Sequence, residues 1–375
     1  MSMLVKNVTN DLPTNKRAAM YYKTEAFYTD VNKYVHTNNW EILAACRILN
    51  QKGYSVDVID RGNTGWTPSE KFDLFLGLGV GNTGRSFVRH ANISGAPVKV
   101  LLAMGPQPDI SNERTLERYK MFQDRTGFHA PPMRTVSDVT GDKFSQIMET
   151  ADCIFNIGEK GTPSYDSFLK YDKPVLNFYP SISPAVSFAE SWKDTRKRDN
   201  FLCFAGNGFI CKGVDLVLES FLKDPSKQLH ICGPTSEAAF FNYYGEKIKK
   251  APNITFHGFV QPGAEVFNKL ASICSFVVFH SASEGCCTSV ATAIRAGLVP
   301  IVNPWTGILI DNNGILMPDS GNIIDTISNT INMASSMTDD EYMTLLDNSL
   351  EKSKKFSQES FVESYSAALD QIIGA

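Results

Sequence analysis

The chain has 375 residues, more than one ordinary hydrophobic core accommodates and enough for two α/β domains. A composition of 43% hydrophobic and 20% charged residues excludes disordered and fibrous proteins. With 36 basic and 40 acidic residues the net charge is −4, so we expect no global attraction to nucleic acid or anionic lipid. The basic run Lys193–Arg198 contains an acid and is interpreted as a solvated face, with weak peripheral membrane contact as the alternative.

Residues 1–13 are polar and Asn-rich, and no segment has the pattern of a signal peptide or the length of a spanning helix, so we expect a cytoplasmic protein. The eight cysteines are scattered, mostly inside apolar segments, which predicts small buried hydrophobic side chains in a reducing compartment. Cys286 and Cys287 are adjacent and lack the Cys-x-x-Cys spacing of a zinc or redox site. No metal site is therefore predicted.

From Arg17 onward, short apolar segments alternate with segments of helical period, which is the pattern of βαβ units and parallel sheets. We predict strands at 18–22, 55–59, 74–77, 98–104, 153–157 and 175–178, and helices at 40–50, 113–125 and 143–150. A polar, serine-rich linker is expected at 181–200. Beyond it we predict strands at 201–205, 228–232, 254–256, 275–280 and 299–303, helices at 214–222, 237–249, 264–273 and 288–296, and a helical tail at 339–373. The expected fold class is α/β, with two Rossmann-like domains facing across a cleft.

The sharpest motif lies in residues 204–221, where a predicted strand enters a glycine turn and then a helix. Gly206 and Gly208 would let backbone N–H groups approach a phosphate. The helix start adds partial positive charge, and Lys212, followed by Gly213, adds a full one. This pattern predicts a pyrophosphate cradle, with an ordinary strand-to-helix turn and a surface lysine as the alternative.

A second motif, Ser281–Ser289, follows the predicted strand 275–280 and opens a helix. Glu284 would lie at the carboxyl edge of the sheet, beside a helix start that carries Thr288 and Ser289. This arrangement suits hydrogen bonding to a polyol with an anion alongside. Helix caps and a first-turn acid would explain the stability of the helix, but not why two such loops recur in one sheet.

The order of these motifs resembles the donor domain of GT-B glycosyltransferases, in particular the retaining family-4 group. The resemblance rests on Gly206…Lys212-Gly213, Cys232-Gly233-Pro234, Phe256–Phe259, Ser283–Gly285, Ala293…Gly297…Pro300 and Asn313–Ile315, and it covers nearly all of residues 201–320. It implies an acceptor-binding domain at residues 1–190 and a donor-binding domain at 191–355. A C-terminal helix at 356–375 would pack back towards the first domain.

The resemblance also implies roles for single residues. Lys212 would neutralise the departing diphosphate, and Glu284 would bind the transferred sugar. His36 lies in a segment similar to acceptor domains of bacterial members and is the candidate for the family's catalytic histidine, with a helix cap or surface residue as the alternative. The implied donor-binding residues are Gly206, Asn207, Gly208, Gly213, His257, Gly258, Phe259, Gly285, Cys286, Cys287, Thr288, Ser289 and Thr292. The implied acceptor-side residues are Gly79, Gly81 and Asn82.

Two positions depart from the family pattern. Asn207 stands where an arginine is usual, so one charge for the diphosphate is missing. Thr292 stands where a second glutamate usually holds the ribose, and a hydroxyl forms a weaker hydrogen bond than a carboxylate. No Asp-x-Asp motif is present, so a metal–diphosphate site is not predicted and the leaving-group charge would fall to Lys212 and helix dipoles.

We therefore expect a retaining, hexosyltransferase-like glycosyltransferase that needs no cofactor or metal. Its donor would be a UDP- or GDP-sugar, and its acceptor a glycan or glycolipid. One alternative is a weak or inactive GT-B protein that binds sugar nucleotide or glycan, as the two departures suggest. The other is an NAD-dependent oxidoreductase, because Gly79–Gly84 matches the dinucleotide fingerprint. That motif follows the third predicted strand, however, and strand 98–104 offers no acidic residue for a ribose.

Overall fold

The computed structural model describes residues 3–29, 36–133 and 136–374. Their internal contacts divide the chain into two compact units. Unit 1 comprises Met1–Ile110, Ser137–Ser181 and Gln358–Ala375, and unit 2 comprises Ser111–Val136 and Ile182–Ser357. Each unit therefore combines segments that are far apart in the sequence.

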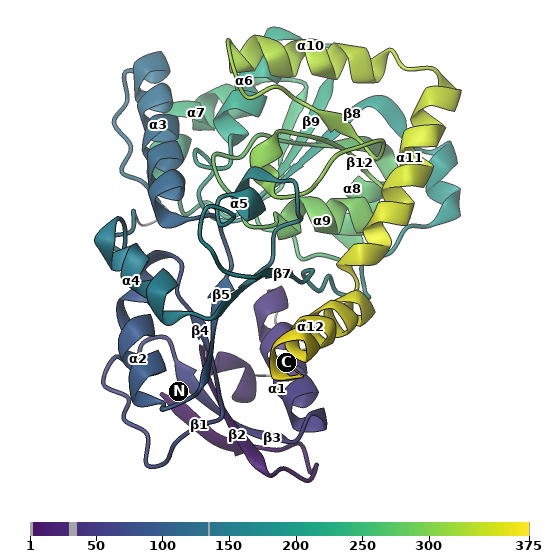
Figure 1. Cartoon of the computed structure of the whole chain (residues 1–375). Helices are drawn as coiled ribbons and strands as arrows, with labels where there is room; N and C mark the ends of the chain where they lie inside the picture. Colours follow the sequence, from purple (N-terminus) through teal and green to yellow (C-terminus); the bar gives the residue numbers. More distant parts are fainter. Residues whose placement is uncertain (1–2, 30–35, 134–135, 375) are drawn as a thin grey trace. The chain divides into compact units, whose positions relative to one another are not determined.

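Unit 1 contains a seven-stranded sheet in the order β1-β3-β2-β4-β5-β6-β7, in which only β1 pairs antiparallel. Its strands are β1 Leu4–Val8, β2 Lys16–Tyr22, β3 Tyr54–Asp60, β4 Leu74–Leu78, β5 Val98–Ala103, β6 Cys153–Asn156 and β7 Val175–Asn177. Its helices are η1 Glu25–Phe27, α1 Thr37–Gln51, η3 Gly81–Ser86, α2 Phe87–Ile93, α4 Asp142–Thr150, α5 Pro163–Asp166 and α12 Gln358–Ile373. Figure 1 shows α2 and α4 on one side of the sheet, and α1 and α12 on the other.

Unit 2 contains a six-stranded, fully parallel sheet in the order β10-β9-β8-β11-β12-β13. Its strands are β8 Lys197–Phe204, β9 Gln228–Cys232, β10 Ile254–Phe256, β11 Cys274–Phe279, β12 Val299–Val302 and β13 Ile315–Leu316. Helix α3 Pro108–Thr126 belongs to this unit from Ser111 onward. The other helices of the unit are η4 Glu190–Asp194, α6 Val214–Lys223, α7 Ala238–Lys250, α8 Glu265–Ile273, α9 Thr288–Arg295, η5 Pro304–Thr306, α10 Ile323–Ser335, α11 Asp339–Ser353 and η6 Lys354–Phe356.

The sequence pattern explains these elements. All six residues of β11, Cys-Ser-Phe-Val-Val-Phe, are buried, as expected of a central parallel strand covered on both faces. Helix α8 buries Phe267, Leu270 and Ala271, whose spacing places them on one helical face. A capping box between Thr338 and Glu341 begins α11. The two helix-covered parallel sheets confirm the predicted α/β class with two Rossmann-like domains.

Several elements were not predicted. Strand β1 is a short edge strand with polar residues, and α2 has only seven residues. Helix α10 is rich in Ser, Thr and Asn, which are weak helix formers, so its stability comes from packing of its apolar face rather than from propensity. Strand β8 begins at Lys197, inside the predicted linker, because Lys197 pairs with Cys274 of β11.

Two helices belong to a different unit from the segments that flank them in the sequence. Residues 111–136, including most of α3, belong to unit 2, although the sequence analysis places them in a domain spanning residues 1–190. Helix α12 packs within unit 1, where Phe361 contacts Trp40 and Tyr365 contacts Phe155. The assignment of acceptor and donor roles to the two domains stays a prediction.

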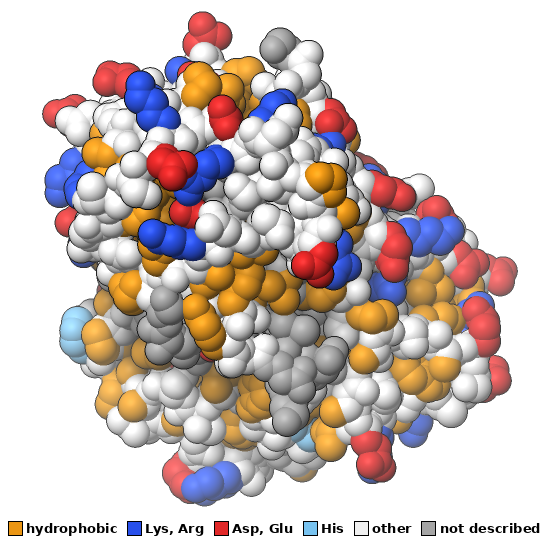
Figure 2. All heavy atoms as spheres, turned by 90° about the horizontal axis from the view of Figure 1, so that it is seen from below, with side chains coloured by type: hydrophobic (Ala, Val, Ile, Leu, Met, Phe, Trp, Pro, Cys, Tyr) orange, Lys and Arg blue, Asp and Glu red, His pale blue; other side chains and the backbone are white. Residues whose placement is uncertain are grey.

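Charges of both signs are interspersed on the face of the molecule drawn in Figure 2, in keeping with the net charge of −4. The interpretation of the basic run as a solvated face is wrong for Arg196. Its guanidinium donates to the carbonyl oxygens of Ala271 at 3.0 Å and Ala296 at 2.7 Å. It thereby satisfies carbonyl groups at the ends of α8 and α9, where a cation is favoured.

Candidate functional site

The strand order of unit 2 reverses between β8 and β11, which are neighbours in the sheet. From β8 the chain continues to β9 on one side, and from β11 to β12 on the other. In parallel α/β sheets, ligands bind beyond the carboxyl ends of the strands at such a switch point. The loops that follow β8 and β11 contain the two motifs selected from the sequence, so both motifs lie at the edge of unit 2 where this fold binds ligands.

The two predicted catalytic side chains of these loops are in contact. Lys212 Nζ donates a hydrogen bond to Glu284 Oε1 at 2.5 Å, and the side chains are only 15% and 14% exposed. A partly buried pair is screened less than a surface pair, so the attraction is stronger. The arrangement brings together a cation suited to phosphate and a carboxylate suited to sugar hydroxyls.

Glycines shape the loop between β8 and α6 in different ways. Gly208 and Gly213 have φ angles of +86° and +72°, in the left-handed region that favours glycine. A Cβ on Gly213 would lie 2.1 Å from the carbonyl oxygen of His280, so this glycine serves close packing between the two loops. A Cβ on Gly206 would meet no atom of the described residues within 4 Å. The open part of the loop is therefore at Gly206, whereas the start of α6 is packed against protein.

The loop of Glu284 is supported from behind by η5. The backbone N–H of Glu284 donates to the carbonyl oxygen of Trp305 at 2.9 Å, and that of Cys287 to Thr306 at 2.8 Å. Gly307 completes this support, because a Cβ there would lie 1.8 Å from the carbonyl oxygen of Gly285. These contacts fix the backbone that leads from Glu284 into α9.

The same loop leads into the start of α9, where the predicted phosphate- and sugar-binding residues lie. Gly285, Cys286 and Cys287 are buried, whereas Thr288 and Ser289 are half-buried. A helix N-terminus presents backbone N–H groups and partial positive charge, which favours an anion.

The two predicted departures have structural partners. Asn207 is exposed, and its Oδ1 accepts a hydrogen bond from Ser236 Oγ at 2.7 Å. Thr292 is buried in α9, and its Oγ1 donates to the carbonyl oxygen of Thr288 at 2.7 Å. Because this hydrogen bond uses the only hydroxyl proton of Thr292, the side chain can act towards a ligand only as an acceptor.

The predicted base-side residues follow β10. His257 Nε2 lies 3.1 Å from Nδ1 of His230 on β9, and burial lowers the pKa of His257. Burial and the neighbouring His257 lower the pKa of His230 to about 4, so both rings are neutral at pH 7. Gly258 accepts a hydrogen bond from the N–H of Gly233 at 2.8 Å. Phe259 is 65% exposed, which leaves an aromatic face available for stacking.

The remaining candidates lie in unit 1. His36 is exposed and caps α1, its Nδ1 accepting from the N–H of Asn38 at 3.3 Å. Gly79 is tightly packed, because a Cβ there would lie 2.2 Å from Leu101. Gly81 begins η3, and Asn82 Oδ1 accepts from the N–H of Asp138 at 3.3 Å. A catalytic role for His36 and an acceptor role for the glycine loop stay predictions.

The dinucleotide fingerprint has the wrong context for a nucleotide-binding turn. The glycine loop follows β4, which comes after β2 and β3 in the parallel part of the sheet, and it enters η3 rather than opening an α-helix. The fingerprint requires the first strand and a helix N-terminus that faces the pyrophosphate. The oxidoreductase alternative therefore gains no support.

Several polar residues that the sequence analysis did not select hold the site together. Arg114 and Arg118 on α3 contact the loop of Glu284. Glu237 at the start of α7 contacts the loop of Lys212, and Tyr119 on α3 contacts Glu237. One signal for the arginines was available, since Arg114, Arg118 and Arg125 are spaced by four and seven residues and so share a helical face. Their place in unit 2 could not be predicted, because α3 lies in the sequence between strands β5 and β6, which both belong to unit 1.

All eight cysteines are free and buried, as predicted. Burial raises the pKa of Cys287 to about 11, so its thiol is protonated and unreactive at neutral pH. Within residues 3–29, 36–133 and 136–374, no group of three or more His, Cys, Asp or Glu side chains is arranged to hold a metal ion. The helices of the same part of the chain include none with the length and apolar character needed to cross a membrane.

Comparison with known proteins agrees with this architecture. Residues 188–329 match the model of the family described as glycosyl transferases group 1. HepE of Anabaena, solved with UDP and glucose, is similar with a TM-score of 0.60 and 12% identity over 96% of this chain and 100% of that one. A comparison with curated protein sequences gave no match.

Two further structures are similar over 96% of this chain and 100% of their own. One is sucrose-phosphate synthase from Thermosynechococcus elongatus, with a TM-score of 0.57 and 13% identity. The other is WaaG, a glycosyltransferase involved in lipopolysaccharide biosynthesis, with a TM-score of 0.57 and 14% identity. At such identities the likeness concerns the fold. Residues 188–329 thus correspond to a group 1 glycosyltransferase domain, within a chain that has the two-domain α/β fold of GT-B glycosyltransferases.

Proposed function

We propose that this protein is a retaining glycosyltransferase that transfers a hexosyl group from a nucleoside diphosphate sugar, without a metal ion, to a hydroxyl of a glycan or glycolipid. The observation that supports it most is the Lys212–Glu284 pair at the carboxyl ends of β8 and β11. The match of residues 188–329 to a glycosyltransferase family and the UDP and glucose bound to HepE support the same substrate class.

In this proposal each member of the pair has a separate task. Departure of the nucleoside diphosphate develops negative charge on the leaving oxygen, and the ammonium of Lys212 stabilises that charge. Glu284 accepts hydrogen bonds from the hydroxyls of the transferred sugar. The N–H groups at the start of α9 would contact the phosphates, and the exposed ring of Phe259 would stack on the base. In this proposal each member of the pair takes up a ligand partner when the donor binds.

The alternative of a binding protein without turnover is favoured by one observation. The hydroxyl of Thr292 donates to its own helix at 2.7 Å, so the position offers no strong hold on a ribose. Such a protein would bind nucleoside diphosphate without hydrolysing any nucleotide-sugar, and this difference separates the two functions in one experiment.

The test combines binding with slow donor hydrolysis. Purified protein is screened with UDP, GDP and ADP for thermal stabilisation, and with the corresponding glucose, N-acetylglucosamine and mannose conjugates for release of nucleotide. A ligand at one hundred times its Kd stabilises the folded state by about 2.7 kcal/mol, which is readily detected. We expect one nucleotide to stabilise the protein and its sugar conjugate to be hydrolysed.

Variants of the pair supply the second arm. Lys212→Met and Glu284→Gln should each lower hydrolysis on the order of 100-fold, the usual effect of losing one electrostatic contact to the transition state. The matched control is Lys227→Met, which breaks the 2.6 Å ion pair of Lys227 with Asp199, a lysine of similar exposure outside both loops. If no nucleotide stabilises the protein and no conjugate is hydrolysed, the proposed function is wrong.

A further inference from the structure

We propose that α3 positions the Lys212–Glu284 pair, through Arg118 and Arg114 on the loop of Glu284 and through Tyr119 on the loop of Lys212. This inference rests on the proposed function. Helix α3 lies outside residues 188–329, which match the glycosyltransferase family, yet it belongs to unit 2 from Ser111 onward. The positioning residues would therefore come from a part of the chain that the matched domain does not contain.

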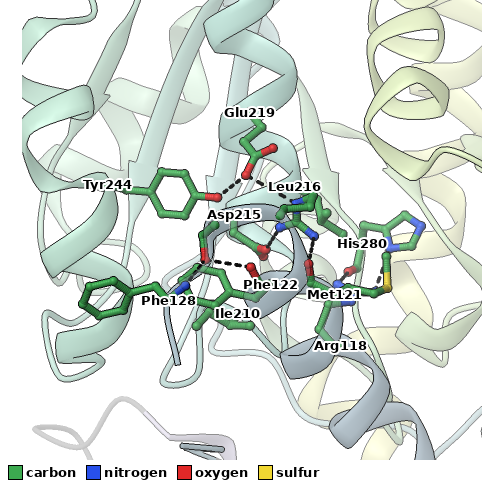
Figure 3. A network of polar contacts seen from close by, with 12 residues as sticks. Arg118, Met121, Phe122, Phe128, Ile210, Asp215, Leu216, Glu219, Tyr244 and His280 are labelled. Atoms are coloured by element: carbon green, nitrogen blue, oxygen red, sulfur yellow. Dashed lines mark hydrogen bonds and ion pairs between the residues drawn. The ribbon is translucent and has the colours of Figure 1, made fainter. Parts of the chain in front are cut away.

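Arg118 holds His280, the residue that follows β11 and begins the loop of Glu284. Its side chain is buried, and its guanidinium donates to the carbonyl oxygen of His280 at 2.7 Å and to Nδ1 of the same residue at 3.0 Å (Figure 3). Because a guanidinium can only donate, Nδ1 must be the acceptor and the proton of the neutral ring lies on Nε2. Burial and the charge of Arg118 lower the pKa of His280 well below its ordinary value, so the ring stays neutral.

Two further contacts continue along the same loop. Arg114 Nε donates to the carbonyl oxygen of Ala282 at 2.8 Å, and Ser283 Oγ donates to Oγ of Ser111 at 3.2 Å. The spacing of Ser111, Arg114 and Arg118 places the three side chains on one face of α3. This face thus contacts three of the four residues that immediately precede Glu284.

Arg114 also reaches the support behind Glu284. Its guanidinium lies 4.4 Å from the ring centroid of Trp305, and the carbonyl oxygen of Trp305 accepts the N–H of Glu284 at 2.9 Å. Arg114 is held in place by an ion pair with Asp319. The backbone of Glu284 is therefore fixed between a loop and a turn that both contact Arg114.

Tyr119 acts on the other loop through Glu237. The hydroxyl of Tyr119 donates to Glu237 Oε1 at 2.6 Å, and Glu237 Oε2 accepts the N–H of Ile210 at 3.0 Å. Ile210 precedes Lys212 by two residues. Burial raises the pKa of Glu237, whereas its hydrogen bonds from Tyr119 and Ile210 lower it. The hydroxyl of Tyr119 also accepts the N–H of Met133 at 2.9 Å, which fixes its own position.

A direct contact links the two loops as well, since the N–H of Ala282 donates to the carbonyl oxygen of Cys211 at 2.8 Å. Glu284 and Lys212 thus stand one or two residues from backbone atoms that α3 holds directly or through Glu237. Misplacing a reacting group by 1 Å can reduce the rate about 100-fold, so small changes at α3 should reach the chemistry without contact to the ligand.

The test compares two arginines of the same helix. Arg118→Lys keeps the charge and removes the two-point contact with His280. Arg125→Lys is the matched control, because Arg125 forms ion pairs with Asp215 and Glu219 on α6 rather than contacts with the loop of Glu284. Both variants weaken the attachment of α3, but only Arg118→Lys alters the support of Glu284.

We expect Arg118→Lys to lower kcat for nucleotide-sugar hydrolysis at least about tenfold, with the Kd of free nucleotide unchanged, since Glu284 acts on the sugar. Tyr119→Phe should show the converse, weakening nucleotide binding about fivefold through the loop of Lys212. Arg125→Lys should change only the thermal midpoint. Arg114→Lys serves as a second variant if Arg118→Lys fails to fold.

The outcomes separate the two proposals. If wild-type protein binds and hydrolyses a donor, but Arg118→Lys and Arg114→Lys leave kcat unchanged or lower it no more than Arg125→Lys does, the positioning role of α3 is refuted while the proposed function stands. If wild-type protein neither binds nor hydrolyses any donor, the proposed function itself fails.

Discussion

Glu41 on α1 provides a sharp prediction about stability. It is 3% exposed, and its Oε1 accepts hydrogen bonds from the N–H and the hydroxyl of Ser181 at 2.9 and 3.3 Å. Among the described residues its other carboxylate oxygen has no hydrogen-bond partner, and Glu41 lines an apolar pocket with Tyr22 and Tyr365. Burial raises the pKa of Glu41 from 4.5 to about 7, against the lowering effect of the hydrogen bonds from Ser181.

The sign of the effect follows from the raised pKa. Between pH 4.5 and about 7 the folded state holds a proton on Glu41 that the unfolded state has released, so the stability supplied by the neutral carboxyl is lost as the pH rises. The difference between the two pKa values corresponds to about 3 kcal/mol at pH 8. Glu41→Gln keeps an acceptor for Ser181 and cannot ionise. We expect it to match wild type at pH 4.5 and to be more stable by up to about 3 kcal/mol at pH 8.

Urea unfolding at intervals from pH 4.5 to 8.5 measures this difference. Glu149→Gln, on the exposed face of α4 in the same unit, is the control and should leave the pH profile unchanged. A constant difference between Glu41→Gln and wild type across the range, or a less stable variant at pH 8, would refute the assignment of a neutral buried carboxyl.

Three further predictions concern unit 2. Gly213→Ala should destabilise the fold, because its Cβ would lie 2.1 Å from the carbonyl oxygen of His280, whereas Gly206→Ala should leave the thermal midpoint unchanged and weaken nucleotide binding in calorimetry. Asn207→Arg should tighten nucleoside diphosphate binding about tenfold by adding a charge-assisted contact. If the variant and the wild-type protein bind the nucleotide with equal affinity, Asn207 does not lie at the phosphate site. Cys287 should resist iodoacetamide in native protein at pH 7.5, as mass spectrometry of the modified peptide can show, because burial raises its pKa to about 11.

Much of the fold was readable because parallel strands are apolar and continuous. The predicted strands 228–232 and 254–256 coincide with β9 and β10, and the strand predicted at 275–280 overlaps β11. The two loops of the site were also found from sequence, since glycines and a charged residue after an apolar strand mark the carboxyl edge of such a sheet. The contact between Lys212 and Glu284 could be predicted only with knowledge of the strand order, which places β8 beside β11.

The support of the site was not readable for a different reason. Arg118 and Tyr119 act through contacts with His280 and Glu237, more than 100 residues away, and no local pattern specifies such partners. Thr292 differs, because its hydrogen bond goes to Thr288, only four residues earlier in α9. Sequence patterns thus selected the two loops that follow β8 and β11, but not the side chains that hold these loops in position.

The central claim is that Lys212 and Glu284 form the donor site of a glycosyltransferase, and nucleotide release from a panel of nucleotide-sugars tests it most directly. Wild-type protein and Lys227→Met should hydrolyse the same conjugate at equal rates, and both Lys212→Met and Glu284→Gln should be slower on the order of 100-fold. Hydrolysis that persists in both pair variants, or its absence from the wild-type protein across the panel, would contradict the claim.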